Sequence, residues 1–383
     1  MQTKTTFRWL VFLMICISGL AACTSRLSST ETLSPFAPVR TNTLTFTPAS
    51  TSTLTPVPPT ATHTPSLTPS PTITLTPGSL PTFQAAGLYS GVSPASYIPS
   101  TCQYLYSRWN LMTNSQPGTV VVPVMFHSIA GDTRPAGDVT TITESYFHSF
   151  MDHAAQLGFQ TITTAQLADF LENNAKIPPR SMILIIDDRK RAQYFTTFFE
   201  PYQKKYGWTV TNAWISHPDT PAYLWNENAA LVPTGLVDFQ AHGVIHNIPI
   251  EPDSSDAFIH TELYGPLTAM LDHFGSKPIA YIWPRGLFTA KAVQVARQAG
   301  YQLGFSSYPR GPLLFNWIPI GEPERQVNDP LMVLPRSWDT TALTDLDKAV
   351  AISQAAQAFA NQNKGTETGY YAQYCKNYPG PLP

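Results

Sequence analysis

Two adjacent acids, Asp187 and Asp188, directly follow the apolar run at residues 181–186. This run predicts a buried strand of an α/β sheet, and such folds place their chemistry at the carboxyl ends of the strands. Neighbouring carboxylates repel each other unless a cation or a proton offsets their charge. His242 and His246 follow a second predicted strand, and histidine is a ligand of zinc and similar ions. The pattern therefore indicates a metal site beside a catalytic base.

The elements that must position these residues alternate between strands and helices. Hydrophobic periodicity predicts strands over residues 120–126, 159–163, 181–186, 210–215, 236–241 and 279–283. It predicts helices over residues 143–157, 164–173, 194–206, 226–232, 261–274 and 289–299. A strand-then-helix rhythm implies parallel β/α units, so we expect a distorted (β/α)7-type barrel, complete or partial. The first strand ends at His127, for which a structural and a catalytic role are equally compatible with the sequence.

The N-terminus has the features of an export signal. Lys4 and Arg8 precede an apolar stretch at residues 9–20, and two alanines then lead to Cys23. This pattern resembles a bacterial lipoprotein signal, in which residues 1–22 are removed and Cys23 is lipidated. An ordinary signal peptide or a single membrane anchor is the alternative, although the apolar stretch is short for a spanning helix. We therefore expect an exported protein that its lipid holds at the extracellular face of the cell membrane.

Residues 23–93 are predicted to form the lipid anchor and a linker. The linker consists mostly of Thr, Ser and Pro, and such a segment buries too little apolar surface to offset its ordering entropy. It predicts a disordered, extended stalk before one α/β domain at residues 94–383. The formal net charge of −2 and the lack of a basic run argue against a nucleic-acid partner.

Two further cysteines, Cys102 and Cys375, lie near opposite ends of the predicted domain. In an oxidising exterior they are candidates for a disulfide that ties the C-terminal tail to the start of the domain. Two reduced buried thiols are the alternative, and they are less expected in an exported chain.

Several segments match one family in order and spacing. These segments are residues 122–129, 185–188, 235–246, 280–286 and 299–305. The region from about Val121 to Asp339 resembles the polysaccharide deacetylase family, which is the NodB-homology domain of carbohydrate esterase family four. Residues 331–338 resemble the branch that acts on exported poly-N-acetylglucosamine.

The resemblance implies a role for each residue of the predicted site. Asp187 is expected to be the general base, and Asp188, His242 and His246 are expected to bind a divalent metal. Zinc is the first candidate, with cobalt or nickel as alternatives. A bound divalent ion lowers the pKa of its water toward about 7, so that hydroxide becomes available near neutrality. The backbone N–H of Arg285 is expected to help stabilise the oxyanion.

The implied activity is hydrolysis of N-acetyl groups on an amino-sugar polymer. Poly-N-acetylglucosamine, peptidoglycan or a chitin-like polymer are the candidate partners, with substrate contacts expected from His127, Trp283 and Pro284. Three departures favour an alternative, a glycan-binding lipoprotein with impaired catalysis. The family has glycine at Arg189 and a hydroxyl residue at Gly243, and its last Leu-x-His motif has no match in this chain.

Overall fold

A computed structural model of the protein describes residues 78–131, 140–245, 247–378 and 380–382. The predicted signal peptide, the lipidation site Cys23, most of the predicted linker and His246 lie outside these residues. Within the described part of the chain, every helix is too short or too polar to cross a membrane.

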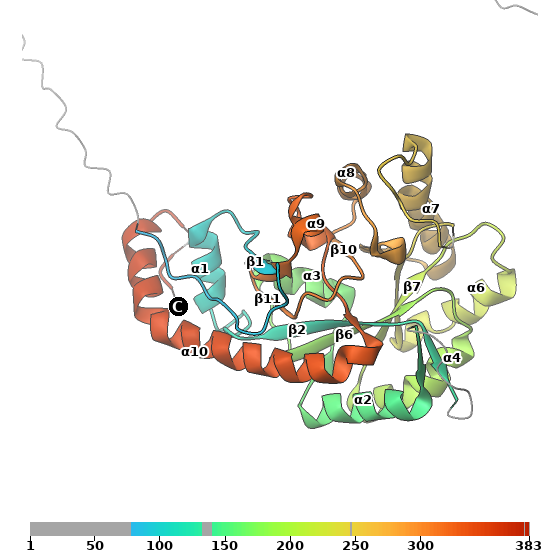
Figure 1. The fold of residues 1–383 in the computed structure, drawn as a ribbon, viewed down its shortest axis with the longest axis horizontal. Coiled ribbons are helices and arrows are strands. Elements are labelled where there is room, and N and C mark those ends of the chain that lie inside the picture. The colour runs from blue at the N-terminus through green and yellow to red at the C-terminus, as the bar shows by residue number, and fades with distance from the viewer. Residues whose placement is uncertain (1–77, 132–139, 246, 379, 383) are drawn as a thin grey trace, which may run out of the picture. The chain divides into compact units, whose positions relative to one another are not determined.

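The core is a curled sheet in which the main strands run parallel (Figure 1). The strands follow the order β10-β9-β8-β7-β6-β2, and the short β11 is antiparallel to β2. Their bounds are β2 Val120–Phe126, β6 Arg180–Asp187, β7 Val210–Trp214, β8 Val237–Ala241, β9 Ala280–Ile282, β10 Leu303–Phe305 and β11 Leu313–Leu314. These strands are almost entirely buried because helices and loops cover both faces, as their β-branched, apolar sequences require.

The two ends of this sheet are joined by residues 334–338. Leu334 forms a parallel bridge with Phe305 of β10. A few residues later, β13 (Ser337–Trp338) pairs in parallel with β2. The sheet is therefore closed on itself through a short, irregular strand, which is the distorted (β/α) barrel that the sequence predicts.

The shorter strands are β1 Ser93–Ala95, β3 Ser128–Ala130, β4 Thr141–Thr143, β5 Gln160–Thr161 and β12 Ile318–Ile320. They form small additional pairs: β1 with β12, β3 with β4, and β5 with β6 of the main sheet. The helices are α1 Thr101–Trp109, α2 Glu144–Gln156, α3 Thr164–Asn173, α4 Ala192–Phe198, α5 Glu200–Tyr206, α6 Ala222–Ala229, α7 Asp256–Phe274, α8 Ala290–Ala299, α9 Glu322–Arg325 and α10 Ala342–Tyr374.

Three helix predictions were wrong in their bounds. The helix expected over residues 261–274 begins at Asp256, because Ser255 caps it by accepting a hydrogen bond from Phe258 N. The helix expected over residues 194–206 is two helices, because Pro201 lies in the first turn of α5 and has no N–H to continue α4. The helix expected over residues 226–232 spans Ala222–Ala229 and is followed by a 3-10 turn that contains Pro233. The α3 prediction is confirmed at both ends, with a capping box formed by Thr163 and Gln166 at its start.

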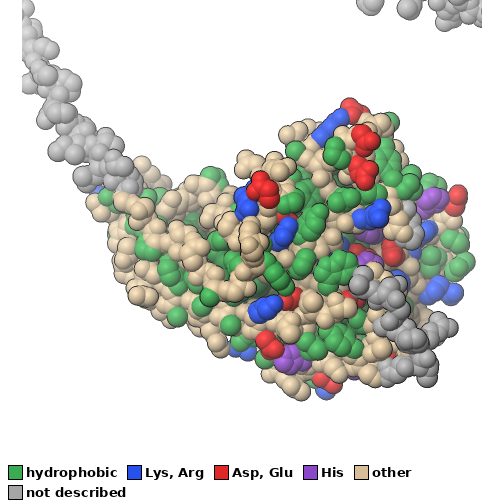
Figure 2. Space-filling model, in the orientation of Figure 1, with side chains coloured by type: hydrophobic (Ala, Val, Ile, Leu, Met, Phe, Trp, Pro, Cys, Tyr) green, Lys and Arg blue, Asp and Glu red, His purple; other side chains and the backbone are tan. Residues whose placement is uncertain are grey.

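The longest helix, α10, runs across β2 and meets α1 at one end of the molecule (Figure 1). No helix was predicted in either place. Glu367 of α10 is buried and accepts hydrogen bonds from Arg108 Nε (2.9 Å) and Trp109 Nε1 (2.7 Å) of α1. The predicted disulfide between Cys102 and Cys375 is confirmed in this same contact. Figure 2 shows that charged side chains are sparse on the visible face of this end.

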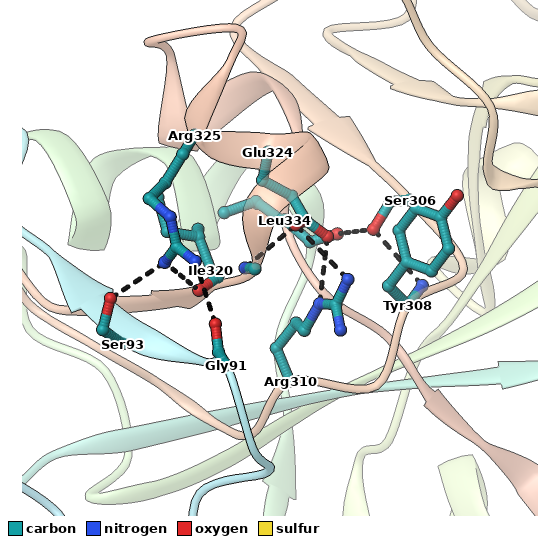
Figure 3. A network of polar contacts seen from close by, with 10 residues as sticks. Gly91, Ser93, Ser306, Tyr308, Arg310, Ile320, Glu324, Arg325 and Leu334 are labelled. Atoms are coloured by element: carbon teal, nitrogen blue, oxygen red, sulfur yellow. Dashed lines mark hydrogen bonds and ion pairs between the residues drawn. The ribbon is translucent and has the colours of Figure 1, made fainter.

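The folded part of the chain begins before the predicted boundary at residue 94. Phe83 packs against Trp317 and Phe359, with ring centroids 5.7 and 5.6 Å away. Farther along, Arg325 donates hydrogen bonds to the Ser93 hydroxyl and the Gly91 carbonyl (Figure 3). The end of the predicted linker is thus part of the domain, because its few apolar side chains find partners there.

Removing the disulfide by the double substitution Cys102→Ser and Cys375→Ser is expected to lower stability. The bond closes a loop with a sequence separation of 273 residues. The chain-entropy model assigns such a loop about 5 kcal/mol, as an upper value. Thermal unfolding with and without reductant measures the effect: the wild type should lose melting temperature on reduction, and the variant should not respond. Equal melting temperatures for the wild type and the variant in the absence of reductant would contradict the prediction.

Candidate active site

The centre of the site is Asp187, the last residue of β6. Its side chain is buried, with 3% of the residue exposed. Arg336 Nη1 donates a hydrogen bond of 2.6 Å to Asp187 Oδ1. Burial by itself raises the pKa of Asp187, but the positive charge of Arg336, followed by His242 and His127, outweighs it and holds that pKa below its usual value. The carboxylate is therefore ionised at neutral pH.

Arg336 directly precedes β13 and is 1% exposed. Its Nε donates a hydrogen bond of 2.7 Å to the Ser306 carbonyl, just after β10. The guanidinium therefore links β6, the end of β10 and the closing strand. No role was predicted for Arg336, although a cation within the apolar segment 331–338 must find an anion once it is buried.

Asp188 follows in the left-handed conformation, with φ of 70°, which ends the strand. Asn212 of β7 stabilises this turn through its Nδ2, which donates hydrogen bonds to the carbonyls of Ile186 (2.8 Å) and Asp188 (2.9 Å). Because few non-glycine residues adopt positive φ, the turn needs such support. The role of Asn212 was not predicted. The sequence shows it only as a polar residue within a predicted strand.

His242 follows β8 and lies at the same edge of the sheet. It is 7% exposed, and its Nδ1 is 2.7 Å from the Ile282 carbonyl. A carbonyl only accepts hydrogen bonds, so Nδ1 carries the proton and Nε2 carries the lone pair in the neutral ring. This is the tautomer and the orientation that a metal-ligating histidine needs. Among the described residues, His242 thus has the geometry of a metal ligand.

The turn after His242 is held by Glu262 of α7. Glu262 Oε2 accepts a hydrogen bond from Val244 N (2.8 Å), and Oε1 accepts one from Ile245 N (3.1 Å). His246 comes next and lies outside the described residues. Accordingly, the described residues form no cluster of three or more potential metal ligands. Two of the three predicted ligands, Asp188 and His242, follow strands that lie two apart in the sheet.

His127 follows β2, and its Nε2 is 3.5 Å from Asp187 Oδ2. Its ring stacks on Trp338, with centroids 6.1 Å apart. Burial lowers the pKa of His127, while the nearby Asp187 charge acts in the opposite direction. The histidine therefore lies beside Asp187, and its contact with substrate stays a prediction.

Two predicted substrate contacts, those of Trp283 and Pro284, lie in the segment after β9. Trp283 is fully buried and its Nε1 donates a hydrogen bond of 2.7 Å to the Met332 carbonyl, so it packs in the core and cannot form a wall for substrate. Pro284 is also buried. The prediction that these two residues contact substrate is wrong, because the strand carries them beneath the surface.

Arg285, in contrast, is exposed and has a φ of 56° in a 3-10 turn. The backbone N–H groups of Gly286 (2.8 Å) and Leu287 (3.2 Å) donate the hydrogen bonds of this turn. The Arg285 N–H takes no part in them. Arg189, where the family has glycine, donates a hydrogen bond of 2.7 Å to the Thr220 hydroxyl on the loop after β7. Its guanidinium is therefore anchored to a neighbouring loop.

Comparison with protein families identifies one match. Residues 174–304 match the family described as polysaccharide deacetylase, which is about a third of the chain. This range includes Asp187, Asp188, His242, His246 and Arg285. The predicted resemblance is confirmed for this segment, which is similar to a family of hydrolases that remove acetyl groups. No curated protein sequence matches the chain.

Several solved structures are also similar to the chain. The deacetylase PplD from Streptococcus pyogenes, in complex with acetate, has 18% identity and a TM-score of 0.49 over 60% of this chain and 98% of that one. A polysaccharide deacetylase from Bacillus cereus has 19% identity and a TM-score of 0.47 over 60% and 69%. IcaB from Ammonifex degensii has 18% identity and a TM-score of 0.47 over 63% and 100%.

The pair of Arg336 and Asp187 can be tested by its effect on stability. Arg336→Ala leaves a buried carboxylate without its cation, and breaking such a pair typically lowers the free energy of unfolding by about 3–5 kcal/mol. Denaturant unfolding of the metal-free protein measures this loss. The double variant Asp187→Asn, Arg336→Ala removes both charges and should recover part of it. Losses that simply add in the double variant would contradict direct coupling between the two side chains.

Proposed function

We propose that the protein hydrolyses N-acetyl groups on an amino-sugar polysaccharide in a metal-dependent reaction that releases acetate. One observation carries this proposal. A buried carboxylate, Asp187, is kept ionised at the strand edge where His242 presents a metal-ligating tautomer. A general base next to a candidate metal ligand is the arrangement that hydrolysis by activated water requires.

Asp187 is assigned the role of general base. Because Arg336 binds one of its oxygens, the carboxylate is fixed in orientation and Oδ2 remains to accept a proton from water. Asp188, His242 and His246 would hold the metal. When bound, a divalent ion supplies positive charge that makes water acidic enough to yield hydroxide near neutral pH.

Two further groups are assigned to the reacting amide. The Arg285 N–H, which its own turn does not use, would donate to the oxygen of the acetyl carbonyl as negative charge develops there. His127, 3.5 Å from Asp187, is proposed to pass a proton toward the leaving amine. The bond that breaks is the amide C–N bond, and the products are acetate and a free amine on the sugar.

The proposed substrate is poly-N-acetylglucosamine or a related N-acetylated polymer such as peptidoglycan or chitin. The resemblance of residues 331–338 to one branch of the family supports the first of these. The lipoprotein-like N-terminus and the Thr/Ser/Pro-rich stretch support a site of action at the cell surface, where such polymers occur. Zinc is the proposed ion, with cobalt or nickel as alternatives.

Acetate release from N-acetylglucosamine oligomers tests the activity. The zinc-loaded full chain should release acetate, and Asp187→Asn should be slower by about 10²–10⁴, the usual contribution of a general base. Treatment with a chelator should abolish release, and added zinc should restore it. Glycan binding without acetate release at any metal loading would overturn the enzyme and leave the glycan-binding lipoprotein with impaired catalysis.

The proposed anchor depends on Cys23. In a host that processes lipoproteins, the wild type should incorporate labelled fatty acid and sediment with membranes. Cys23→Ser should lose the label and leave the membrane fraction, because a thiol is needed for the lipid bond. Unchanged membrane association of Cys23→Ser would contradict lipidation at this position and favour a membrane-anchoring N-terminal segment.

A further inference from the structure

A buried carboxylate lies beneath the turn that follows His242. Glu262, in the middle of α7, is 0% exposed. Its two oxygens accept hydrogen bonds from consecutive backbone N–H groups, those of Val244 at 2.8 Å and Ile245 at 3.1 Å. One side chain thus binds the backbone of the turn on the side that leads to His246.

The turn and the helix are shaped for this contact. Gly243 has a φ of 78°, and a Cβ at this position would lie 2.3 Å from Glu262 Oε2. One turn along the same face of α7, a Cβ on Gly265 would lie 2.7 Å from the Cγ2 atom of Val244. Two glycines, one on each element, therefore allow the carboxylate and the turn to approach. Gly243 is also one of the positions where the sequence departs from the family pattern.

Burying a carboxylate in this place carries a desolvation cost. Burial is the largest influence on Glu262 and raises its pKa, and the two backbone N–H groups act against this effect. The positions around Glu262 on this face of α7 are apolar, including Ile259, Leu263 and Met270. An apolar side chain would avoid the desolvation penalty of a charge but would leave the Val244 and Ile245 N–H groups without their acceptor. The carboxylate is therefore kept for its contact with the turn after His242.

We propose that Glu262 is a positioning residue for the metal centre, an inference that rests on the proposed function. By accepting from Val244 and Ile245, it fixes the backbone between the predicted ligands His242 and His246. The path of the chain from one predicted ligand to the next depends on that backbone. Groups that orient ligands in this way typically contribute 10–100-fold to metal affinity.

The experiment compares metal binding by the full chain and its Glu262→Gln variant. The glutamine side chain has the same size and keeps one acceptor oxygen. Its N–H₂ group replaces the other oxygen and cannot accept from the backbone N–H, so one hydrogen bond is lost. We expect zinc affinity, measured by competition with a chromophoric chelator, to fall by about 10–100-fold. The visible spectrum of the cobalt-loaded protein should also change, because it reports ligand geometry.

Glu324 provides a matched control. It is equally buried, at 1% exposed, and its Oε2 accepts from the Gly321 N–H at 2.9 Å while Arg310 pairs with Oε1 (Figure 3). It contacts none of the candidate metal ligands. Glu324→Gln is therefore expected to change thermal stability and leave zinc affinity and the cobalt spectrum unchanged.

A second variant disturbs the contact between Glu262 and the turn through a residue of the turn. Gly243→Ala places a Cβ against Glu262 Oε2 and should weaken zinc binding in the same direction. Because both substitutions break one contact, the double variant should lose less affinity than the sum of the single losses. Additive losses in the double variant would overturn the inference.

The remaining outcomes separate this inference from the proposed function. If the wild type binds no zinc or cobalt, the metal-dependent function and the role of Glu262 both fail. If the wild type binds metal and Glu262→Gln binds it equally well, only the inference fails. An equal loss of affinity in Glu262→Gln and Glu324→Gln would also overturn it, because the effect would then be general destabilisation.

Discussion

The hydrogen-bonded ion pair between Arg336 and Asp187 connects the closure of the barrel to its chemistry. Arg336 lies immediately before the strand that pairs with β2, and it also binds the Ser306 carbonyl after β10. The closing segment is short and irregular, so few backbone hydrogen bonds hold it in register. The buried ion pair fixes the register of this segment, because any other register would leave both charges desolvated and unpaired. The same contact orients the carboxylate that we assign as the base.

Groups from neighbouring elements hold the other candidate residues in the same manner. The side chain of Asn212, in β7, supports the turn at Asp188 after β6. The Ile282 carbonyl, in β9, sets the tautomer of His242 after β8. Each of these contacts joins adjacent strands near their carboxyl ends. The parallel sheet thus does more than bring the candidate residues to one edge. Its regular spacing also places a hydrogen-bonding partner beside each of them.

The parts of the site that the sequence revealed are those with local signals. Asp187 and Asp188 end an apolar run, and the spacing of His242 and His246 is visible without a structure. Arg336 and Glu262 act through partners far away in the chain, so periodicity could show only that each is a charge on an apolar segment. The burial of Trp283 depends on which side of β9 faces the core, and a strand of three residues is too short to show this by alternation. Helix α10 escaped prediction because four of its nine buried residues are alanines and two are acids, which give little contrast with its polar face.

Buried carboxylates elsewhere in the domain show why Glu262 is different. Glu367 is paired with Arg108 and Glu324 with Arg310, so each of these two carboxylates has a guanidinium that offsets its charge. Asp187 follows the same rule through Arg336. The charge of Glu262 is instead offset by backbone N–H groups of the turn after His242, and its raised pKa reflects this weaker compensation. A metal bound at the proposed ligands would add to this compensation, because Coulomb attraction grows as water is excluded.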